Sequence, residues 1–520
     1  MKNRYIAFTT ILFALALLCA APAPKTFGVV PAPDGGYPGG NTTAGQSALF
    51  SLTTGTYNTA VGLFSLRSNT EGKFNTVTGA GALLLSTGDE NTATGAGALL
   101  SSTTGIQNTA NGAFALLSNT EGSDNTAIGE QTLFTNTIGF ANTANGYQAL
   151  FANTTGNFNT ANGDGALASN SSGDENTATG ESALFSNSTG EKNTANGALA
   201  LVHNTEGSQN TGAGHSALFS NTTGSTNTAT GFNALYINTT GASNTAIGVN
   251  ALFNNTIGDD NTAVGEEALY NNMNGFWNTA LGALSLNSNT TGYENTAIGD
   301  DALGVNTTGY HNTALGQGAG YQVTTANHVI AIGHPGANVD NSCYIGQIYG
   351  QAVDPATAAL AYIDANAKMG TLLSSRRFKR DIKPMDDTSE AILALKPVTF
   401  HYKSDAKSTS CFGLIAEEVA EANPDLIVRD KEGKPYSVRY DAVNAMLLNE
   451  FLKEHKRVEV QQATIKQLKS KAAKQETTIA ELKKGMGVLT ALFKEQAAQI
   501  QKVSAQIEMS RPAPGVVSDR

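Results

Sequence analysis

One short tandem repeat dominates the amino-acid sequence. The motif Asn-Thr-(Ala/Val/Gly/Thr)-x-Gly occurs seventeen times between Asn41 and Gly316, and successive copies begin 17 residues apart, except for one step of 16 from Asn75 to Asn91. A unit this short cannot enclose a core of its own, so it must bury its apolar residues against the units before and after it. The repeat therefore predicts a solenoid over residues 41–316, with one coil per unit.

The fuller consensus is Asn-Thr-Ala-x-Gly-x-x-Ala-Leu-x-x-Asn-Thr-Thr-Gly-x-x, as in residues 244–260. Its Thr-Ala-x segment suits a short strand, and its Gly and Asn positions suit tight turns, where positive φ is needed. The Ala-Leu pair is expected to point inward, and the five residues around it fit either a strand or a single helical turn. At a strand spacing of about 4.8 Å, seventeen coils predict a mainly β rod on the order of 80 Å long.

Two features of the repeat have competing interpretations. The second Asn of many units begins Asn-Thr-Thr, a glycosylation sequon, but turn chemistry and stacking of Asn side chains explain its position better. The Thr columns that stacking produces are interpreted as solvated strand residues, with binding of ice or a polysaccharide as the alternative. Acidic residues such as Asp89, Glu90, Asp174 and Glu175 lie at turn positions, which favours solubilising charges over the paired carboxyls of a glycosidase.

Charge is distributed unevenly along the chain. The chain has 32 Lys/Arg and 43 Asp/Glu residues, of which residues 374–520 contain 25 Lys/Arg and 20 Asp/Glu. Residues 1–373 therefore contain 7 Lys/Arg and 23 Asp/Glu, a net charge of −16. Nucleic-acid binding needs clustered Lys and Arg, so no nucleic-acid partner is expected for the array. The seven His residues are scattered without ligand spacing, so we expect no metal site and no cofactor.

The N-terminus has the pattern of a secretory signal peptide. Lys2 and Arg4 precede an apolar run from Ile6 to Leu18 and a stretch of small residues, which predicts a signal peptide over residues 1–23 and a linker over 24–40. The run is short for a membrane span and no other segment is apolar enough, so a secreted or cell-surface protein without a transmembrane span is expected. Lipidation of Cys19 is the alternative, against which the bulky Leu18 argues.

The period breaks after Gly316. Residues 317–373 contain three Gly-rich, strand-like segments, at 329–333, 343–346 and 361–364. An atypical terminal segment is what a solenoid needs to cover its exposed end, so residues 317–373 are interpreted as a cap and neck. The two cysteines beyond the signal peptide, Cys343 and Cys411, are expected to be small buried thiols, and a bridge between them is the alternative.

The sequence from Ser374 onward predicts a small α+β domain over residues 374–456, followed by a coiled coil over 457–508 and a disordered tail over 509–520. Its expected elements are a helix or turn at 389–395, strands at 397–402 and 411–416, a helix from Glu417 to Asn423, a hairpin of 426–428 with 436–438, and a helix with Asp441 as N-cap.

The coiled coil is predicted from a heptad in which every a position is apolar: Val458, Ile465, Ala472, Ile479, Met486, Phe493, Ile500 and Ile507. The d positions alternate between Leu or Val and Gln. Such regularity predicts self-association, but the pattern alone does not separate a dimer from a trimer. The array offers no other associating surface that the sequence identifies.

The junction Leu372-Leu373-Ser374-Ser375-Arg376-Arg377-Phe378-Lys379-Arg380-Asp381-Ile382, together with Gly413-Leu414-Ile415-Ala416-Glu417-Glu418-Val419, resembles the endosialidase-type intramolecular chaperone of phage tail fibres and bacterial surface proteins. The resemblance covers residues 374–456 and implies a homotrimer and an autocatalytic serine endopeptidase that acts once on its own chain. The repeat array resembles, more loosely, the heads of trimeric autotransporter adhesins, whose repeat is shorter.

In that family a Ser and a Lys five positions later form a catalytic dyad, and the bond cut precedes the Ser. The resemblance therefore implies Ser374 and Lys379 as the dyad and Leu373–Ser374 as the bond. A lysine serves as the base when burial or neighbouring cations lower its pKa, and three arginines lie within three residues of Lys379.

Ser375 stands where the family usually has Asp or Asn, which leaves open which Ser acts. In the alternative interpretation, Ser374 and Ser375 cap a turn and the basic run is a solvated linker.

The predicted function is a secreted trimeric surface fibre or adhesin-like protein, with a surface glycan or another cell-surface ligand as its target. Its C-terminal chaperone domain would drive trimer folding and then cleave itself off. The alternative is a structural fibre whose C-terminal domain stays attached as a permanent trimerisation clamp. A glycan-cleaving enzyme with the array as its catalytic head is a third, weaker interpretation.

Overall fold

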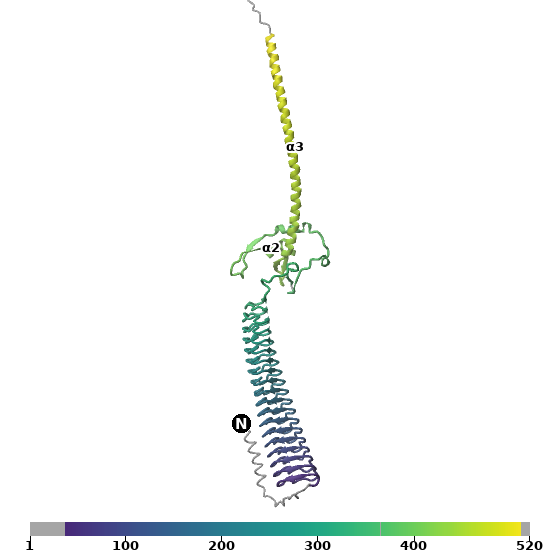
Figure 1. Cartoon of the computed structure of the whole chain (residues 1–520), viewed down its shortest axis with the longest axis vertical. Helices are drawn as coiled ribbons and strands as arrows, with labels where there is room; N and C mark the ends of the chain where they lie inside the picture. Colours follow the sequence, from purple (N-terminus) through teal and green to yellow (C-terminus); the bar gives the residue numbers. More distant parts are fainter. Residues whose placement is uncertain (1–36, 365, 511–520) are drawn as a thin grey trace, which may run out of the picture. The chain divides into compact units, whose positions relative to one another are not determined.

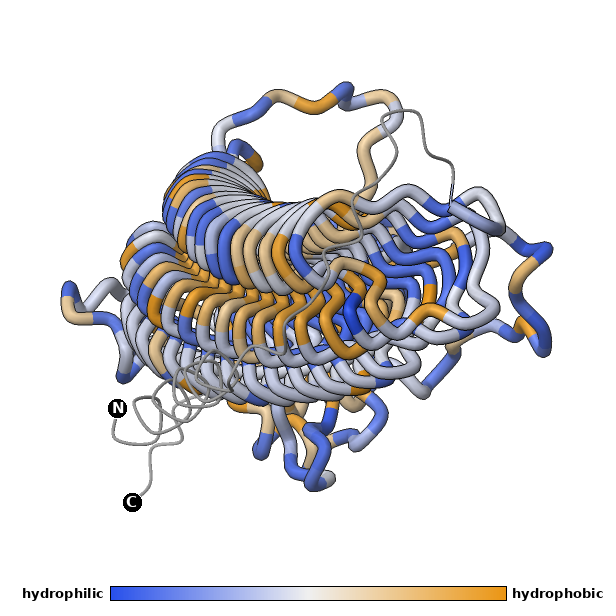
Figure 2. The backbone as a smooth tube through the Cα atoms, turned by 90° about the horizontal axis from the view of Figure 1, so that it is seen from below, coloured by the Kyte–Doolittle hydropathy of each residue, from blue (hydrophilic) through white to orange (hydrophobic). Residues whose placement is uncertain are grey.

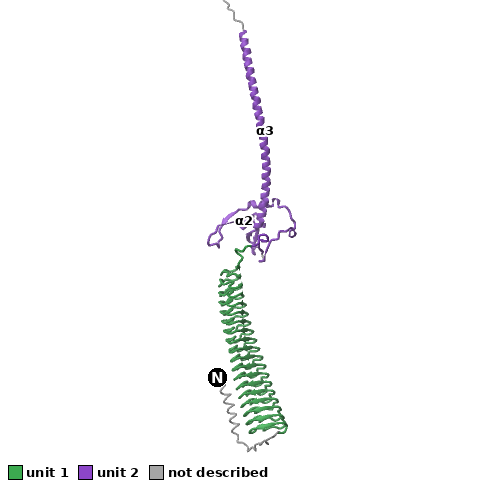
Figure 3. Cartoon of the chain, in the orientation of Figure 1, with its two compact units in different colours: residues 1–352 green, residues 353–520 purple. Residues whose placement is uncertain are grey.

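The computed structural model describes residues 37–364 and 366–510. They form two compact units, one ending at Ala352 and the other beginning at Val353 (Figure 3). The predicted signal peptide, Cys19, most of the linker and residues 511–520 of the tail lie outside the described residues.

The first unit is a parallel β-solenoid, which confirms the predicted fold (Figure 1). Each strand pairs in parallel with the next strand along the chain, and from β1 to β17 the register places Thr on Thr, as at Thr42 and Thr59. The shortened step leaves this register intact, because Thr76 still pairs with Thr92. Its strands are β1 (Thr42–Ala44), β2 (Thr59–Val61), β3 (Thr76–Thr78), β4 (Thr92–Thr94), β5 (Thr109–Asn111), β6 (Thr126–Ile128), β7 (Thr143–Asn145), β8 (Thr160–Asn162), β9 (Thr177–Thr179), β10 (Thr194–Asn196), β11 (Thr211–Ala213), β12 (Thr228–Thr230), β13 (Thr245–Ile247), β14 (Thr262–Val264), β15 (Thr279–Leu281), β16 (Thr296–Ile298), β17 (Thr313–Leu315), β18 (Ile330–Ile332) and β19 (Cys343–Ile345).

The solenoid core consists of the middle residue of most strands and the Ala-Leu pair of most coils, as Ala246, Ala251 and Leu252 illustrate, all with no exposed surface. Along the solenoid, residues of similar hydropathy stack in rows (Figure 2). Around Ala-Leu the chain is neither a strand nor a helical turn. It is a turn in which Leu252 has a φ of 52° and donates its N–H to the Ala268 carbonyl of the next coil at 3.0 Å. The left-handed conformation costs roughly 1–2 kcal/mol for a non-glycine residue, and burial of the Leu side chain, at about 1.5–3 kcal/mol, offsets it.

Two buried columns of Asn side chains hold successive coils together. Asn244 donates from Nδ2 to Asn227 Oδ1 at 3.2 Å and to the Gly258 carbonyl at 2.7 Å. In the second column, Asn238 donates to Asn221 Oδ1 at 2.7 Å. Asn221 and Asn238 begin Asn-Thr-Thr sequons but have no exposed surface, so stacking accounts for them as expected. Because a buried amide without partners is costly, these columns also fix the alignment of the coils.

The parallel sheet continues past residue 316 through β18 and β19. Of the three strand-like segments expected in the cap and neck, two are therefore further coils of the solenoid. The third is β20 (Tyr362–Ile363), which pairs antiparallel with β21 (Met369–Gly370) in the second unit. The expectation of two buried thiols is wrong: Cys343 is exposed because it takes an outward position in β19, and Cys411 is half-buried. Both are free thiols.

The second unit contains short elements and one long helix. They are the 3₁₀ helices η1 (Arg376–Phe378), η2 (Asp386–Ala394) and η3 (Pro424–Leu426), strands β22 (Val398–Phe400), β23 (Cys411–Gly413), β24 (Ile427–Arg429) and β25 (Pro435–Val438), and helices α2 (Ala416–Ala422) and α3 (Tyr440–Met509). The segment 389–395, expected to be a helix or a turn, belongs to a 3₁₀ helix that begins earlier. The N-cap of α3 is Arg439, and Asp441 lies instead in the first turn, where a carboxylate suits the helix dipole.

Helix α3 runs unbroken for 70 residues and passes through Gly485 and Gly487. The predicted coiled-coil segment forms most of it, and its large a residues are exposed in the single chain, from 38% at Val458 to 69% at Met486. The partner of this heptad stays a prediction. Within 37–364 and 366–510, the structure shows no helix with both the length and the apolar character to cross a membrane.

Candidate functional site

The structure brings Ser374 and Lys379 together. The backbone N–H of Phe378 donates to the Ser375 carbonyl, and that of Lys379 to the Arg376 carbonyl, both at 3.0 Å, which closes the single turn η1. This turn places Lys379 Nζ 3.2 Å from Ser374 Oγ. The local sequence therefore folds so that a five-residue spacing gives hydrogen-bond distance between hydroxyl and amine.

Ser375 occupies a different position. It is the N-cap residue of η1, with φ −61° and ψ 142°, and its side chain makes no capping hydrogen bond. A Ser cap acts through a side-chain oxygen that accepts a backbone N–H, so this serine is not a working cap. Ser374, and not Ser375, contacts the lysine.

The surroundings of the pair are cationic and open to water. Arg377 lies over the Phe378 ring with its guanidinium carbon 4.6 Å from the centroid, and Arg380 is 3.9 Å from the Asp381 carboxylate. Every residue from Thr371 to Asp381 is exposed. An amine acts as a base near neutral pH only when burial or neighbouring cations disfavour its charged form. In the single chain the pair is not buried.

Apolar side chains flank the candidate bond. Leu372 and Leu373 are about 60% exposed, at 60% and 61%, and Phe378 and Ile382 are 52% and 51% exposed. Four large apolar residues within eleven positions are thus left largely in water in the single chain.

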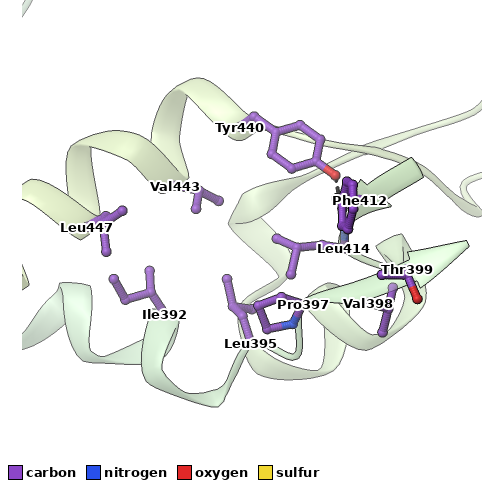
Figure 4. Close-up of a pocket in the computed structure, with 11 residues that line it drawn as sticks. Ile392, Leu395, Pro397, Val398, Thr399, Phe412, Leu414, Tyr440, Val443 and Leu447 are labelled. Carbon is purple, nitrogen blue, oxygen red and sulfur yellow. Dashed lines mark hydrogen bonds between the residues drawn. The ribbon is translucent and has the colours of Figure 1, made fainter. Parts of the chain in front are cut away.

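A second apolar surface of this unit is an open groove of about 690 Å³ (Figure 4). Its walls come from the end of η2, from β22 and β23, and from the first turns of α3. The lining residues are Ile392, Leu395, Pro397, Val398, Thr399, Phe412, Gly413, Leu414, Tyr440, Val443 and Leu447. Phe412 is 82% exposed and Leu447 57%, so the groove leaves much apolar surface in water.

The motif around Gly413 builds one wall of this groove. Tyr440 Oη accepts the backbone N–H of Leu414 at 3.1 Å, the dashed line in Figure 4. A Cβ at Gly413 would lie 2.9 Å from that hydroxyl, so a larger residue there would have to displace Tyr440. Val419 is 1% exposed and belongs to the small core of the unit. The motif is thus structural, and it ties β23 to the start of α3.

A polar cluster joins η2 to α3. The buried Ser389 hydroxyl donates to Glu450 Oε1 and accepts from Asn449 Nδ2 at 2.7 Å. Lys453 lies 2.9 Å from Glu450 and 3.3 Å from Asp387. The hydrogen bonds from Ser389 and then Lys453 lower the pKa of the Glu450 carboxyl, and Glu450 in turn raises the pKa of Lys453. The cluster fixes the position of α3 relative to the groove.

Sequence reasoning did not single out the groove residues Phe412 and Tyr440 or the partners Ser389 and Glu450. Ser389 and Glu450 are 61 positions apart, and only packing brings them together. The available signal was local: Tyr440 stands next to the expected N-terminus of a strong helix.

Residues 374–428 match the family model described as chaperone of endosialidase. The resemblance stated for the C-terminus is therefore confirmed, and the match begins at Ser374. It includes Lys379 and the Gly413 motif and ends before Tyr440. No curated protein matches this chain, and no solved structure matches it.

Proposed function

We propose that this chain is a secreted trimeric surface fibre, adhesin-like in character, whose C-terminal unit directs trimer folding and then cuts the chain between Leu373 and Ser374. A β-solenoid followed by a chaperone domain of this family fits a trimeric fibre. The observation that carries the cleavage step is the 3.2 Å separation of Ser374 Oγ and Lys379 Nζ. The ligand class that such a fibre would take is a surface glycan or another cell-surface molecule.

The reaction proceeds in two steps. Lys379 takes the hydroxyl proton, Ser374 Oγ attacks the carbonyl carbon of Leu373, and the C–N bond breaks as the new C–O bond forms. The proton passes to the released Ser374 amine. Water then hydrolyses the ester, which leaves a carboxylate on Leu373 and the free hydroxyl on Ser374. Nucleophile and target bond lie in adjacent residues, so proximity supplies part of the rate.

Assembly provides the burial that the single chain lacks. The exposed Leu372, Leu373, Phe378 and Ile382 and the groove around Phe412 are apolar surfaces that other copies cover in a trimer. Covering them excludes water from Ser374 and Lys379, so that hydroxyl and amine meet in a partly dry site. Cleavage in this scheme follows trimerisation, and the product retains its shape as a kinetically trapped rod.

The test is the mass of the chain after expression. Cleavage should release a fragment of 147 residues (520 − 373) with Ser374 at its N-terminus. Ser374→Ala and Lys379→Ala should each leave a full-length chain that still forms trimers. Ser375→Ala is the matched control and should still cleave.

A new N-terminus at any other residue, or cleavage that persists in Ser374→Ala, would assign the cut to a different nucleophile or to an external protease.

A second candidate function is the permanent clamp, in which the C-terminal unit trimerises the fibre and stays attached. The exposure of Ser374 and Lys379 and the presence of Ser375 in place of Asp or Asn favour it. An intact wild-type trimer of full-length chains, stable for days, would select the clamp over self-cleavage.

A further inference from the structure

The third residue of each strand in the solenoid points outward, and these residues stack into one column. From β1 to β12 the column is mixed, with Ala, Val, Thr, Asn and one Ile. From β13 to β19 it is apolar without interruption. We call this part the apolar column; its residues are Ile247, Val264, Leu281, Ile298, Leu315, Ile332 and Ile345.

The apolar column is continuous and open to solvent. Its members are direct register partners, as Leu281 with Ile298 and Ile298 with Leu315. Val264 is half-buried and the other six side chains are 37% to 47% exposed. Six strand spacings of about 4.8 Å make the column about 29 Å long. Single exposed apolar residues are ordinary, but an unbroken row of seven is a surface suited to a partner.

The strand face that bears this column carries no charge, whereas the rest of the array is acidic. Residues 37–346 contain 20 Asp/Glu and three Lys/Arg side chains, and none of them lies in strands β1 to β19. Two copies that met through their turns would bring like charges together, which is unfavourable. The sheet face is where two acidic arrays can approach without that repulsion.

We infer that the apolar column packs against the same column of other copies of this chain, so that the arrays associate over β13 to β19 and not over β1 to β12. This inference rests on the proposed trimer. The column occupies the last seven strands of the solenoid, and residues 374–428, which match the chaperone of endosialidase, follow it in the chain. In a parallel trimer, residues of equal height meet, so each Ile or Leu finds the same residue on its neighbours.

We infer a second copy of this chain as the partner because the side chains of the column repeat at the strand spacing. A surface that packs against all of them must repeat at the same spacing. A parallel copy of the same sheet has it by construction. A lipid or a single foreign peptide would not match seven steps in one direction. The cross-linking test below separates these cases, since only self-association joins two equal chains.

The experiment uses the full-length chain with its native cysteines replaced by serine. Leu315→Cys is treated with a short bis-maleimide, and Ile128→Cys is the matched control, since Ile128 lies in the same column with similar exposure (42% against 47%) but between Asn111 and Asn145. We expect at least tenfold more covalent dimer from Leu315→Cys. Light scattering on the same samples measures the oligomeric state independently of the cross-link.

A second variant probes the neighbours of Leu315. Ile298→Asn with Ile332→Asn should remove most of the Leu315→Cys cross-link, while Val61→Asn with Ile128→Asn should leave it unchanged. Asparagine already stands in this column at Asn111, Asn145, Asn162 and Asn196, so the coil accepts it. An unchanged circular dichroism spectrum confirms the fold.

The outcomes are distinct. A trimer by light scattering that does not cross-link at position 315, or that cross-links equally at position 128, overturns the inference and leaves the proposed trimer standing. A monomer overturns both.

Discussion

The two units of this chain differ in how much of their apolar side-chain surface is buried within one chain. In the solenoid, the inward leucines from Leu66 to Leu286 have no exposed surface. In the second unit, only Val419, Leu426, Ile427, Val438 and Met446 are buried among the apolar residues that the structure describes, while Phe412 is 82% and Leu393 73% exposed. Each coil is covered by the next coil of the same chain. The second unit leaves much of its apolar surface in water in the single chain, and other copies would cover it in the trimer proposed above.

The largest effect, loss of the oligomer, is expected from charged residues at the heptad a positions of α3. Ile465→Asp with Ile479→Asp would bury unpaired carboxylates at two a positions, which should abolish the oligomer while the solenoid stays folded. Light scattering measures the mass, and circular dichroism the β content. Ser470→Asp with Thr477→Asp places the same charges on the outer face of the helix and should leave the oligomer intact. A trimer in the first variant would mean that the copies are held elsewhere.

The next effect concerns the closed core of the solenoid. Leu252→Ala removes a side chain with no exposed surface and should destabilise its coil by about 2–5 kcal/mol. Since coils contact only their neighbours, hydrogen exchange should quicken in the adjacent coils and remain slow in distant ones. Leu447→Ala, at a side chain 57% exposed in the single chain, is the comparison and should leave exchange in the solenoid unchanged. Uniformly faster exchange along the whole array would contradict solenoid behaviour.

A smaller effect is expected in the groove of the second unit, if its apolar surface is exposed in the single chain and covered in the trimer. Phe412→Ala removes few contacts within one chain, yet it should lower the yield of trimer several-fold if other copies cover the groove. Tyr436→Ala, at a residue 75% exposed in the hairpin of β24 and β25, is the control and should assemble normally. Equal yields of trimer from both variants would show that the groove stays open in the assembly.

The smallest effect is a dependence of the second unit on acid. The lowered pKa of Glu450 means that its stabilising contribution is complete above the ordinary carboxyl pKa of about 4.3 and is lost as the pH falls through the lowered value. Glu450→Gln should therefore flatten the acid side of a thermal stability profile between about pH 5 and pH 2. Glu481→Gln, on the exposed surface of the same helix, should keep the wild-type profile. An unchanged profile in Glu450→Gln would show that the polar cluster around Glu450 does not cause the loss of stability in acid.

The sequence by itself determined the features that repeat or lie close together. A period of 17 residues forces stacking, so the solenoid, its short Thr-Ala-x strands and the inward Ala-Leu pair were predictable. The pairing of Ser374 with Lys379 spans five residues and one turn, and the structure places them at hydrogen-bond distance. The N-cap of α3 was misplaced because β25 ends at Val438 and leaves Arg439 as the last residue before the helix.

Only the tertiary structure decided what distant residues do together. Leu252 adopts a left-handed turn because its N–H finds the Ala268 carbonyl of the next coil, a contact that no local pattern contains. Gly413 leaves the space that the hydroxyl of Tyr440, 27 positions later, occupies. The apolar column was not singled out from the sequence because its members are a coil apart along the chain, and each of them is a single residue between Ala or Tyr and Gly. Stacking at one strand spacing per coil turns these isolated residues into one surface.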